Sequence, residues 1–257
     1  MFPLYDDNPT EITPFFTVGL ILACVAVWVW VQGAGLSQEV LVDSVCAYGA
    51  IPAEVTGAAG DAATGPPLAR GVACSYGGLT WAALFTSMFL HGSWMHLIGN
   101  MWFLWIFGNN VEDSMGHLRF LVFYLLTGAV AAGAHIASAP ESGVPMVGAS
   151  GAISAIMGAY VLLYPRARVR TLLVIIVFIT LVDLPAWLYL GYWFLIQLAS
   201  SSLPAPAAGG GVAFWAHVGG FVAGLLLVHF FTIGDLVQAK RSHVKLRKDQ
   251  IRHGGWW

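Results

Sequence analysis

Long apolar stretches separated by short polar ones dominate the pattern of this chain. A helix needs about 20 apolar residues to cross the hydrocarbon of a bilayer. Six stretches approach or reach that length, near residues 15–32, 93–111, 118–138, 149–164, 184–202 and 212–233. The fourth is the shortest and begins at Gly148-Ala149-Ser150-Gly151. The pattern predicts six membrane-spanning helices, with the external end of the fourth recessed below the membrane surface.

A further apolar stretch covers residues 171–182. It is too short to cross the hydrocarbon, and Asp183 and Pro185 follow it as the opening of the next helix. We expect this stretch to lie along the membrane interface or to dip into it. A seventh span is the alternative.

Composition supports a membrane protein. The chain has 257 residues, of which 58% are hydrophobic and 9% charged, and its mean hydropathy is +0.75. A soluble domain carries about 25% charged residues, so this chain is suited to a lipid bilayer. The net charge of −2 leaves no basic face for nucleic acid. We predict one all-α integral membrane domain over residues 1–257.

The basic residues predict the orientation of the six spans. Ten of the 11 Lys and Arg residues fall on one side, and only Arg70 falls on the other. Positively charged loops stay in the cytoplasm. We therefore expect cytoplasmic N- and C-termini, a cytoplasmic tail over 235–257 and an external loop over 33–92. The acidic N-terminus does not resemble a cleavable signal peptide.

The external loop contains two cysteines, Cys46 and Cys74, whereas Cys24 lies in the first span. An oxidising compartment favours a disulfide between two external cysteines. Two free thiols are the alternative, and the sequence does not predict the fold of this loop.

Several polar residues lie inside predicted spans, where they are energetically expensive and usually functional. Ser150 starts the recessed fourth span, and His217 lies about two turns into the sixth. His91, His96 and Asn100 accompany the start of the second. All three spans run from outside to inside, so these side chains are expected at similar depths in the external third of the bilayer.

These residue types suit nucleophilic catalysis. A serine is a poor nucleophile until a base removes its proton, and a neutral imidazole does this well near pH 7. Ser150 and His217 supply this pair, and the helix start at Ser150 directs backbone N–H groups at a developing oxyanion. His96 and Asn100 are further donors. Asp183 is predicted on the cytoplasmic side, so we expect a dyad with His217 oriented by packing.

Small residues on the fourth and sixth spans predict close contact between these two helices. Gly151, Ala155 and Gly158 form such a face on the fourth, and Gly220 and Gly224 on the sixth. The alternative is that these residues only permit generic helix packing.

The motifs His91-x4-His96-x3-Asn100, Gly148-Ala149-Ser150-Gly151 and Ala216-His217-Val218-Gly219-Gly220-x3-Gly224 occur in the order seen in rhomboid proteases. The chain resembles a bacterial member of this family over most of its length. Its first external loop is longer and lacks a Trp-Arg pair found in many members.

This resemblance implies a six-helix rhomboid-like bundle in the bacterial inner (plasma) membrane and an intramembrane serine endopeptidase without metal or cofactor. It implies Ser150 as nucleophile, His217 as base, and His96 and Asn100 in the oxyanion hole. The supporting positions that it implies are His91, Gly148, Gly151, Gly220 and Gly224. The family cuts single-span membrane proteins near the outer face, after small residues.

Two other functions are compatible with the sequence. A catalytically inactive relative would serve as a membrane binding or trafficking protein, but such relatives typically lack the serine or the histidine. A haem-carrying or ion-conducting bundle would use His91, His96 and His217 as ligands.

Overall fold

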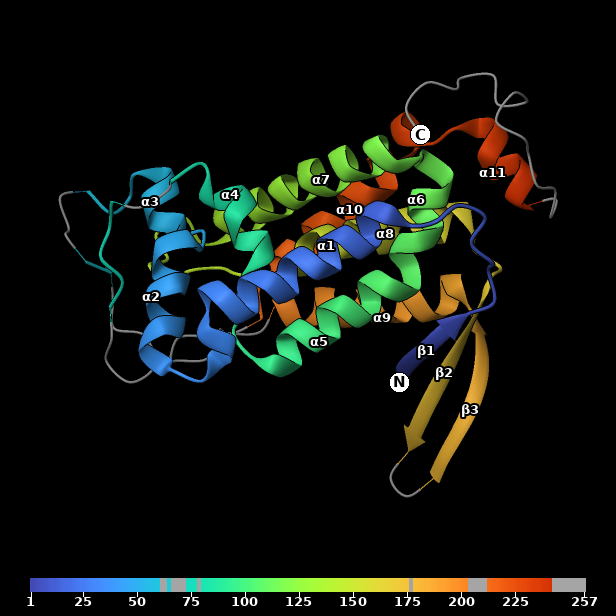
Figure 1. Ribbon diagram of the computed structural model, residues 1–257, viewed down its shortest axis with the longest axis horizontal. Coiled ribbons are helices and arrows are strands. Elements are labelled where there is room, and N and C mark those ends of the chain that lie inside the picture. The colour runs from blue at the N-terminus through green and yellow to red at the C-terminus, as the bar shows by residue number, and fades with distance from the viewer. Residues whose placement is uncertain (61–63, 66–72, 78–79, 176–177, 203–211, 242–257) are drawn as a thin grey trace.

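The computed structural model describes residues 1–60, 64–65, 73–77, 80–175, 178–202 and 212–241. Its helices lie lengthwise beside one another in an elongated bundle (Figure 1). Helices α2 (Gln38–Tyr48) and α3 (Pro52–Thr56) cap one end of the bundle. Helix α11 (Gly234–Arg241) and a small sheet lie at the other end.

Six helical segments coincide with the six apolar stretches of the sequence. They are α1 with η1 (Phe15–Ala26 and Val27–Val31), α5, η5 and α6 (Trp94–Phe103, Leu104–Gly108 and Asn109–Met115), α7 (His117–Ser138), α8 (Ser150–Leu163), α9 (Ala186–Ser201) and α10 (Phe214–Phe231). Within the described residues, α7 and α10 are each long and apolar enough to cross a membrane. Shorter apolar helices cover Phe15–Val31 and Ser150–Leu163.

Helix α8 forms the centre of the bundle, and nearly all of its side chains are buried. It packs most extensively against α10 and α7. A methyl group added to Gly220 or Gly224 would collide with the carbonyl oxygen of Gly151 or Ala155, respectively. The predicted contact between the small faces of the fourth and sixth spans is therefore confirmed, and it brings the start of α8 close to α10.

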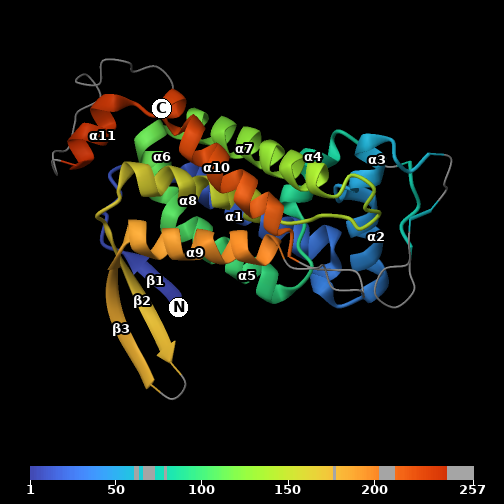
Figure 2. The same ribbon diagram turned by 180° about the vertical axis from the view of Figure 1, so that it is seen from behind.

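A three-stranded antiparallel sheet corrects the all-α prediction. Its order is β1 (Phe2–Asp6), β2 (Arg168–Ile175) and β3 (Phe178–Pro185), and it projects sideways from the bundle (Figures 1 and 2). Residues 171–175 and 178–182 are extended, so this stretch is not a seventh helix. The β-branched residues in β2 and β3 favour strand pairing, and Arg170 adds a cross-strand ion pair with Asp183 at 2.7 Å.

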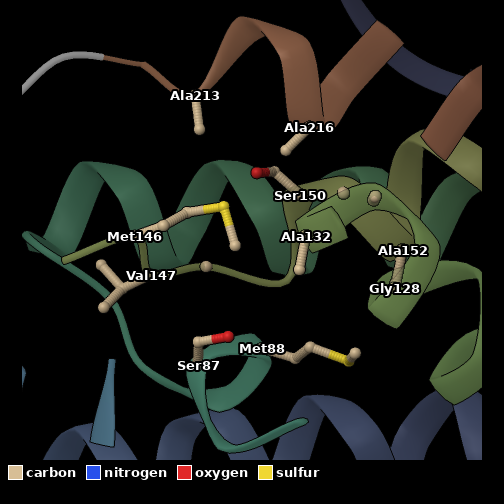
Figure 3. Close-up of a pocket in the computed structure, with 13 residues that line it drawn as sticks. Ser87, Met88, Gly128, Ala132, Met146, Val147, Ser150, Ala152, Ala213 and Ala216 are labelled. Atoms are coloured by element: carbon tan, nitrogen blue, oxygen red, sulfur yellow. The ribbon is translucent and has the colours of Figure 1, made fainter. Parts of the chain in front are cut away.

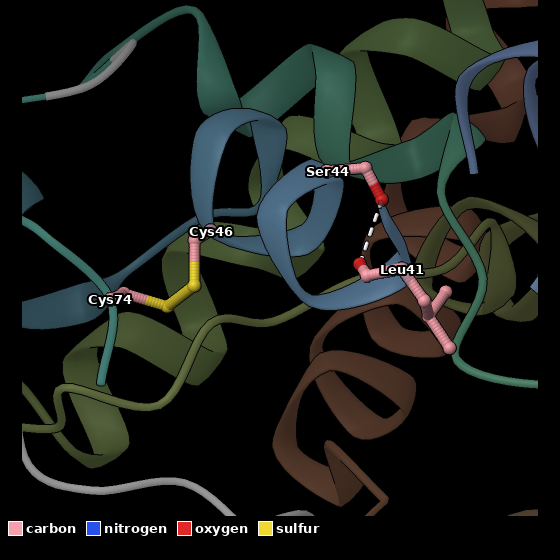
Figure 4. Close-up of a disulfide and its surroundings, with 4 residues drawn as sticks. All are labelled: Leu41, Ser44, Cys46 and Cys74. Atoms are coloured by element: carbon pink, nitrogen blue, oxygen red, sulfur yellow. Dashed lines mark hydrogen bonds between the residues drawn. A yellow bond between two sulfur atoms is a disulfide. The ribbon is translucent and has the colours of Figure 1, made fainter. Parts of the chain in front are cut away.

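The described part of the loop over residues 33–92 is held in place by several contacts. Cys46 of α2 forms a disulfide with Cys74, with 5.2 Å between their Cα atoms, which confirms the predicted pairing (Figure 4). Ala50 exchanges two backbone hydrogen bonds with Met146, in the segment that leads to Ser150. The short elements of this region are η2 (Gly33–Gly35), α4 (Ala83–Thr86) and η4 (Ser87–Phe89).

Acidic side chains of α6 hold the opposite end of the bundle together. The Glu112 carboxylate accepts hydrogen bonds from the backbone N–H groups of Phe16 and Thr17 and so caps the start of α1. Asp113 pairs with the buried Lys240 of α11 at 2.6 Å. These contacts fix the first and last described helices to the centre of the bundle.

Candidate active site

Ser150 and His217 meet where α8 begins. The Oγ atom of Ser150 lies 2.8 Å from the Nε2 atom of His217, within hydrogen-bond distance. Ser150 is the first residue of α8, as expected. His217 lies in the first turn of α10, which corrects the prediction that it lies about two turns into the sixth span. The close approach at Gly220 and Gly151 makes this contact between two helices possible. The sequence prediction that these two side chains lie together is confirmed by this distance.

A residue that the sequence analysis missed completes the contacts of the imidazole. The Oε1 atom of Gln197, on α9, lies 2.9 Å from Nδ1 of His217. The expectation that packing alone orients His217 is therefore wrong. Gln197 is an amide inside the apolar fifth stretch, and the rule that polar groups in spans are expensive would have identified it.

His96 and Asn100 present two N–H donors beside Gly148. The Nδ1 atom of His96 accepts a hydrogen bond from the Gly92 N–H (3.3 Å), so in the neutral ring Nε2 carries the proton. A methyl group on Gly148 would lie 2.7 Å from this Nε2 and 3.6 Å from Nδ2 of Asn100. Gly148 has a φ of 124°, which favours glycine. Both donors thus face the backbone two residues before Ser150.

One of these donors is unused. The Nδ2 atom of Asn100 is buried and has no hydrogen-bond partner among the described residues. Buried polar groups are nearly always paired, and exceptions often mark function. This amide is therefore available to an oxygen that enters the site.

His91 packs against His96. Its ring is fully buried and lies edge-on to the His96 ring, with 5.1 Å between the centroids. The side chain of Gln32 bonds both the backbone N–H and the carbonyl of His91 at 2.8 Å. His91 is thus held in place and limits the orientations open to His96.

A small pocket adjoins Ser150 (Figure 3). Two methionines and Ser87 line it, and most of its other lining residues are glycines or alanines. These are Gly128, Ala131, Ala132, Gly148, Gly151, Ala152, Ala213 and Ala216. Such walls leave room beside the hydroxyl for a small side chain. No group of three or more His, Cys, Asp or Glu within the described ranges is arranged to hold a metal ion.

Comparisons with known proteins identify the family to which the chain is similar. Residues 78–233, more than half of the chain, match the family model of the Rhomboid domain. Rhomboid protease GluP of Bacillus subtilis (strain 168) is 33% identical over 147 residues, which are 56% of this chain and 25% of that protein. Rhomboid protein 1, mitochondrial, of Saccharomyces cerevisiae is 28% identical over 180 residues, 68% of this chain and 46% of that protein.

Rhomboid-like protein 11, chloroplastic, of Arabidopsis thaliana is 39% identical over 85 residues, 32% of this chain and 29% of that protein. The matched part of the chain spans less than half the length of each of these relatives. The match to the family model covers Ser150, His217, Gln197, His96, Asn100 and the residues that line the pocket, and leaves out only Gln32, which bonds the backbone of His91. The chain therefore belongs to the rhomboid family of membrane proteins.

Proposed function

We propose that this protein is an intramembrane serine endopeptidase that cleaves transmembrane segments of single-span membrane proteins with a Ser150–His217 dyad. The observation that carries the proposal is the 2.8 Å separation of Ser150 Oγ and His217 Nε2. Ser150 begins α8 and His217 lies in the first turn of α10, both of which are apolar helices, and Ser150 also lines the pocket.

In the proposed reaction, Ser150 Oγ attacks the scissile carbonyl carbon while His217 Nε2 takes the hydroxyl proton. The carbonyl oxygen becomes an oxyanion that accepts hydrogen bonds from His96 Nε2, Asn100 Nδ2 and the Ser150 N–H. His217 then gives the proton to the leaving amine, and the C–N bond breaks. A water molecule then attacks the acyl carbon while His217 takes its proton. The bond from this carbon to Ser150 Oγ breaks, the carboxylic acid product leaves, and His217 returns the proton to Oγ.

Two observations support the proposed substrate class. The glycine and alanine walls of the pocket suit a small side chain just before the cleaved bond. The relative from Bacillus subtilis is named a rhomboid protease. We further infer that all six helical segments span the bacterial inner membrane, with the site near its outer face and both termini in the cytoplasm.

The test compares purified wild type with Ser150→Ala and His217→Ala on a transmembrane substrate in proteoliposomes. Either substitution should abolish turnover, and the double variant should lose no more, because the pair acts as a unit. A fluorophosphonate should label wild type at Ser150. Ser138→Ala, an exposed serine at the end of α7, is the matched control and should behave as wild type.

Cleavage by Ser150→Ala at the wild-type rate, with contaminating proteases excluded, would refute the proposal. A folded wild type that neither cleaves nor reacts with the fluorophosphonate would favour the catalytically inactive relative instead.

A further inference from the structure

We propose that Gln197 is a positioning residue that fixes the tautomer and ring orientation of His217, so that Ser150, His217 and Gln197 form one hydrogen-bonded chain. This rests on the proposed function. The three residues come from three helices, α8, α10 and α9, which run alongside one another (Figure 2).

The direction of the hydrogen bonds follows from the amide. The Nε2 of Gln197 donates to the backbone carbonyl of Trp193 at 3.4 Å, so its oxygen is the atom that faces His217. An amide oxygen only accepts hydrogen bonds. The Nδ1 of His217 must therefore carry the proton, which leaves the lone pair of Nε2 directed at the Ser150 hydroxyl.

The opposite tautomer would be inactive. It would place the Nδ1 lone pair against the Gln197 oxygen, which is repulsive, and present an N–H to Ser150 instead of a base. The two tautomers have the same shape, so packing cannot choose between them. The rings of Trp193 and Phe214 flank His217, with centroids 5.8 and 6.3 Å away, and restrict only the plane of the ring. Selection of the tautomer thus needs a polar partner.

The hydrogen bond between Gln197 and His217 is buried, so its loss should have a large effect. The side chains of both Gln197 and His217 are buried, with 8% of each residue exposed. Little water can replace a lost partner there, and a hydrogen bond in a low-dielectric interior is stronger than one in water. Asp183 lies on β3, before α9 begins, whereas Gln197 lies near the end of α9. The Asp183 carboxylate pairs with Arg170 and therefore does not replace the Gln197 oxygen as the partner of His217.

Gln197→Met tests the role, because methionine keeps the length of glutamine but cannot accept a hydrogen bond at that position. We expect kcat to fall by about 10²- to 10³-fold, within the range that general-base catalysis contributes, with KM nearly unchanged. Gln197→Glu keeps an acceptor and should restore most of kcat. A carboxylate beside His217 stabilises its protonated form, so the acidic limb of the pH–rate profile should also move to higher pH. The charges of His96 and His135 also interact with His217 and are the same in both proteins.

A spectroscopic readout separates positioning from stability. In ¹⁵N NMR of histidine-labelled protein, assigned with His217→Ala, wild type should show His217 protonated at Nδ1 alone. Gln197→Met should show a mixture of the two tautomers. Leu198→Met, at the next and more exposed position of α9, is the matched control and should change neither the tautomer nor kcat.

The proposal is overturned if Gln197→Met leaves both the tautomer and kcat as in wild type. It is also overturned if Gln197→Glu leaves the acidic limb of the pH–rate profile where it is in wild type. This measurement does not depend on whether Gln197→Met folds. Failure of the proposed function is distinguishable, because an inactive wild type can still show the Nδ1-protonated tautomer that Gln197 alone selects.

Discussion

The residues that precede Ser150 determine where its side chain lies. Gly148 has the positive φ that the turn into α8 requires, and its lack of a side chain lets His96 and Asn100 approach the backbone. The helix then begins at Ser150, where the first amide N–H groups have no partner within the helix. This short segment therefore supplies both the proposed nucleophile and one proposed oxyanion donor, the Ser150 N–H, while the other two donors come from α5.

The variant Asn100→Ala should distinguish the role of this proposed oxyanion donor from the role of the Ser150–His217 dyad. It removes the buried, unpartnered Nδ2 but leaves the Ser150–His217 hydrogen bond intact. Loss of one oxyanion donor lowers kcat by about 10²–10³-fold, and we expect a smaller change in KM. Asn109→Ala, at the other end of the same continuous helix, is the control. Wild-type kcat in Asn100→Ala would exclude this amide from the oxyanion hole.

At the residue scale, the sequence reveals those polar groups that stand in recognisable motifs. Ser150, His217, His96 and Asn100 could be identified because each is a polar residue near the start of an apolar stretch. Gln197 is noticeable as an amide inside the fifth apolar stretch, but it belongs to no motif, so the sequence does not indicate that its partner is His217. Only the packing of α9 against α10 brings the two side chains together.

At the scale of elements, the contact between α8 and α10 determines whether the site can form. Gly224→Ala would drive a methyl group into the backbone of Ala155, which must move the two helices apart. We expect a lower thermal unfolding temperature in detergent and a loss of cleavage of at least tenfold, as overpacking costs about 1–3 kcal/mol.

The matched control for this substitution is Gly133→Ala in α7. A methyl group there would meet no atom within 4 Å, and alanine favours a helix over glycine. This variant should be as active as wild type and no less stable. Equal behaviour of Gly133→Ala and Gly224→Ala would show that the close approach of α8 and α10 is unimportant.

The cap formed by α2 and α3 connects to the site through the segment that contains Met146. The Cys46–Cys74 disulfide anchors α2, and Ala50, just beyond α2, pairs with Met146 of the pocket. Reduction should lower the unfolding temperature and slow turnover severalfold, because the cap loosens over the segment that leads to Ser150. A membrane-impermeant maleimide should label the cap only after reduction. Cys24 is buried and serves as the internal control; labelling of Cys46 without reductant would contradict this pairing.

The sheet shows where prediction of elements from sequence fails. The run 171–182 is apolar without the alternation that marks a half-buried strand, so its pattern cannot distinguish a strand from a short helix. Its pairing with β1 depends on residues Phe2–Asp6, far away in the chain. Whether the sheet lies at the membrane interface, as expected from its apolar residues, stays a prediction.

At the scale of the whole molecule, a buried polar cluster ties the N-terminal strand to the bundle. Asp6 accepts hydrogen bonds from Tyr160 of α8 and Asn110 of α6, and Lys240 of α11 bonds Asn110 as well. Burial raises the pKa of Asp6 from 3.8 to about 6. The folded protein therefore binds the Asp6 proton more tightly than the unfolded chain does.

This shift predicts a pH dependence of stability. The pKa of Asp6 is higher in the folded protein than in the unfolded chain, so protonation of Asp6 stabilises the fold. This contribution to the free energy of unfolding is complete below about pH 4 and is lost as the pH rises through about 6. The unfolding temperature of wild type should therefore fall between pH 4 and 6.5 relative to that of Asp6→Asn, whose amide does not titrate. Parallel curves for the two proteins over this range would contradict the shifted pKa.

The two ends of the bundle also predict its orientation in the membrane. The N-terminal strand and α11 meet at one end through the Asp6, Asn110 and Lys240 contacts, and the disulfide lies at the other. The six crossings proposed above would place both termini on one side, and disulfides persist in oxidising compartments. In a bacterial host, green fluorescent protein fused after Trp257 should fluoresce, whereas alkaline phosphatase at the same position should stay inactive. Phosphatase inserted after Gly57 in the external loop should be active. The reverse result at the two positions would overturn the orientation and place Ser150 on the cytoplasmic side.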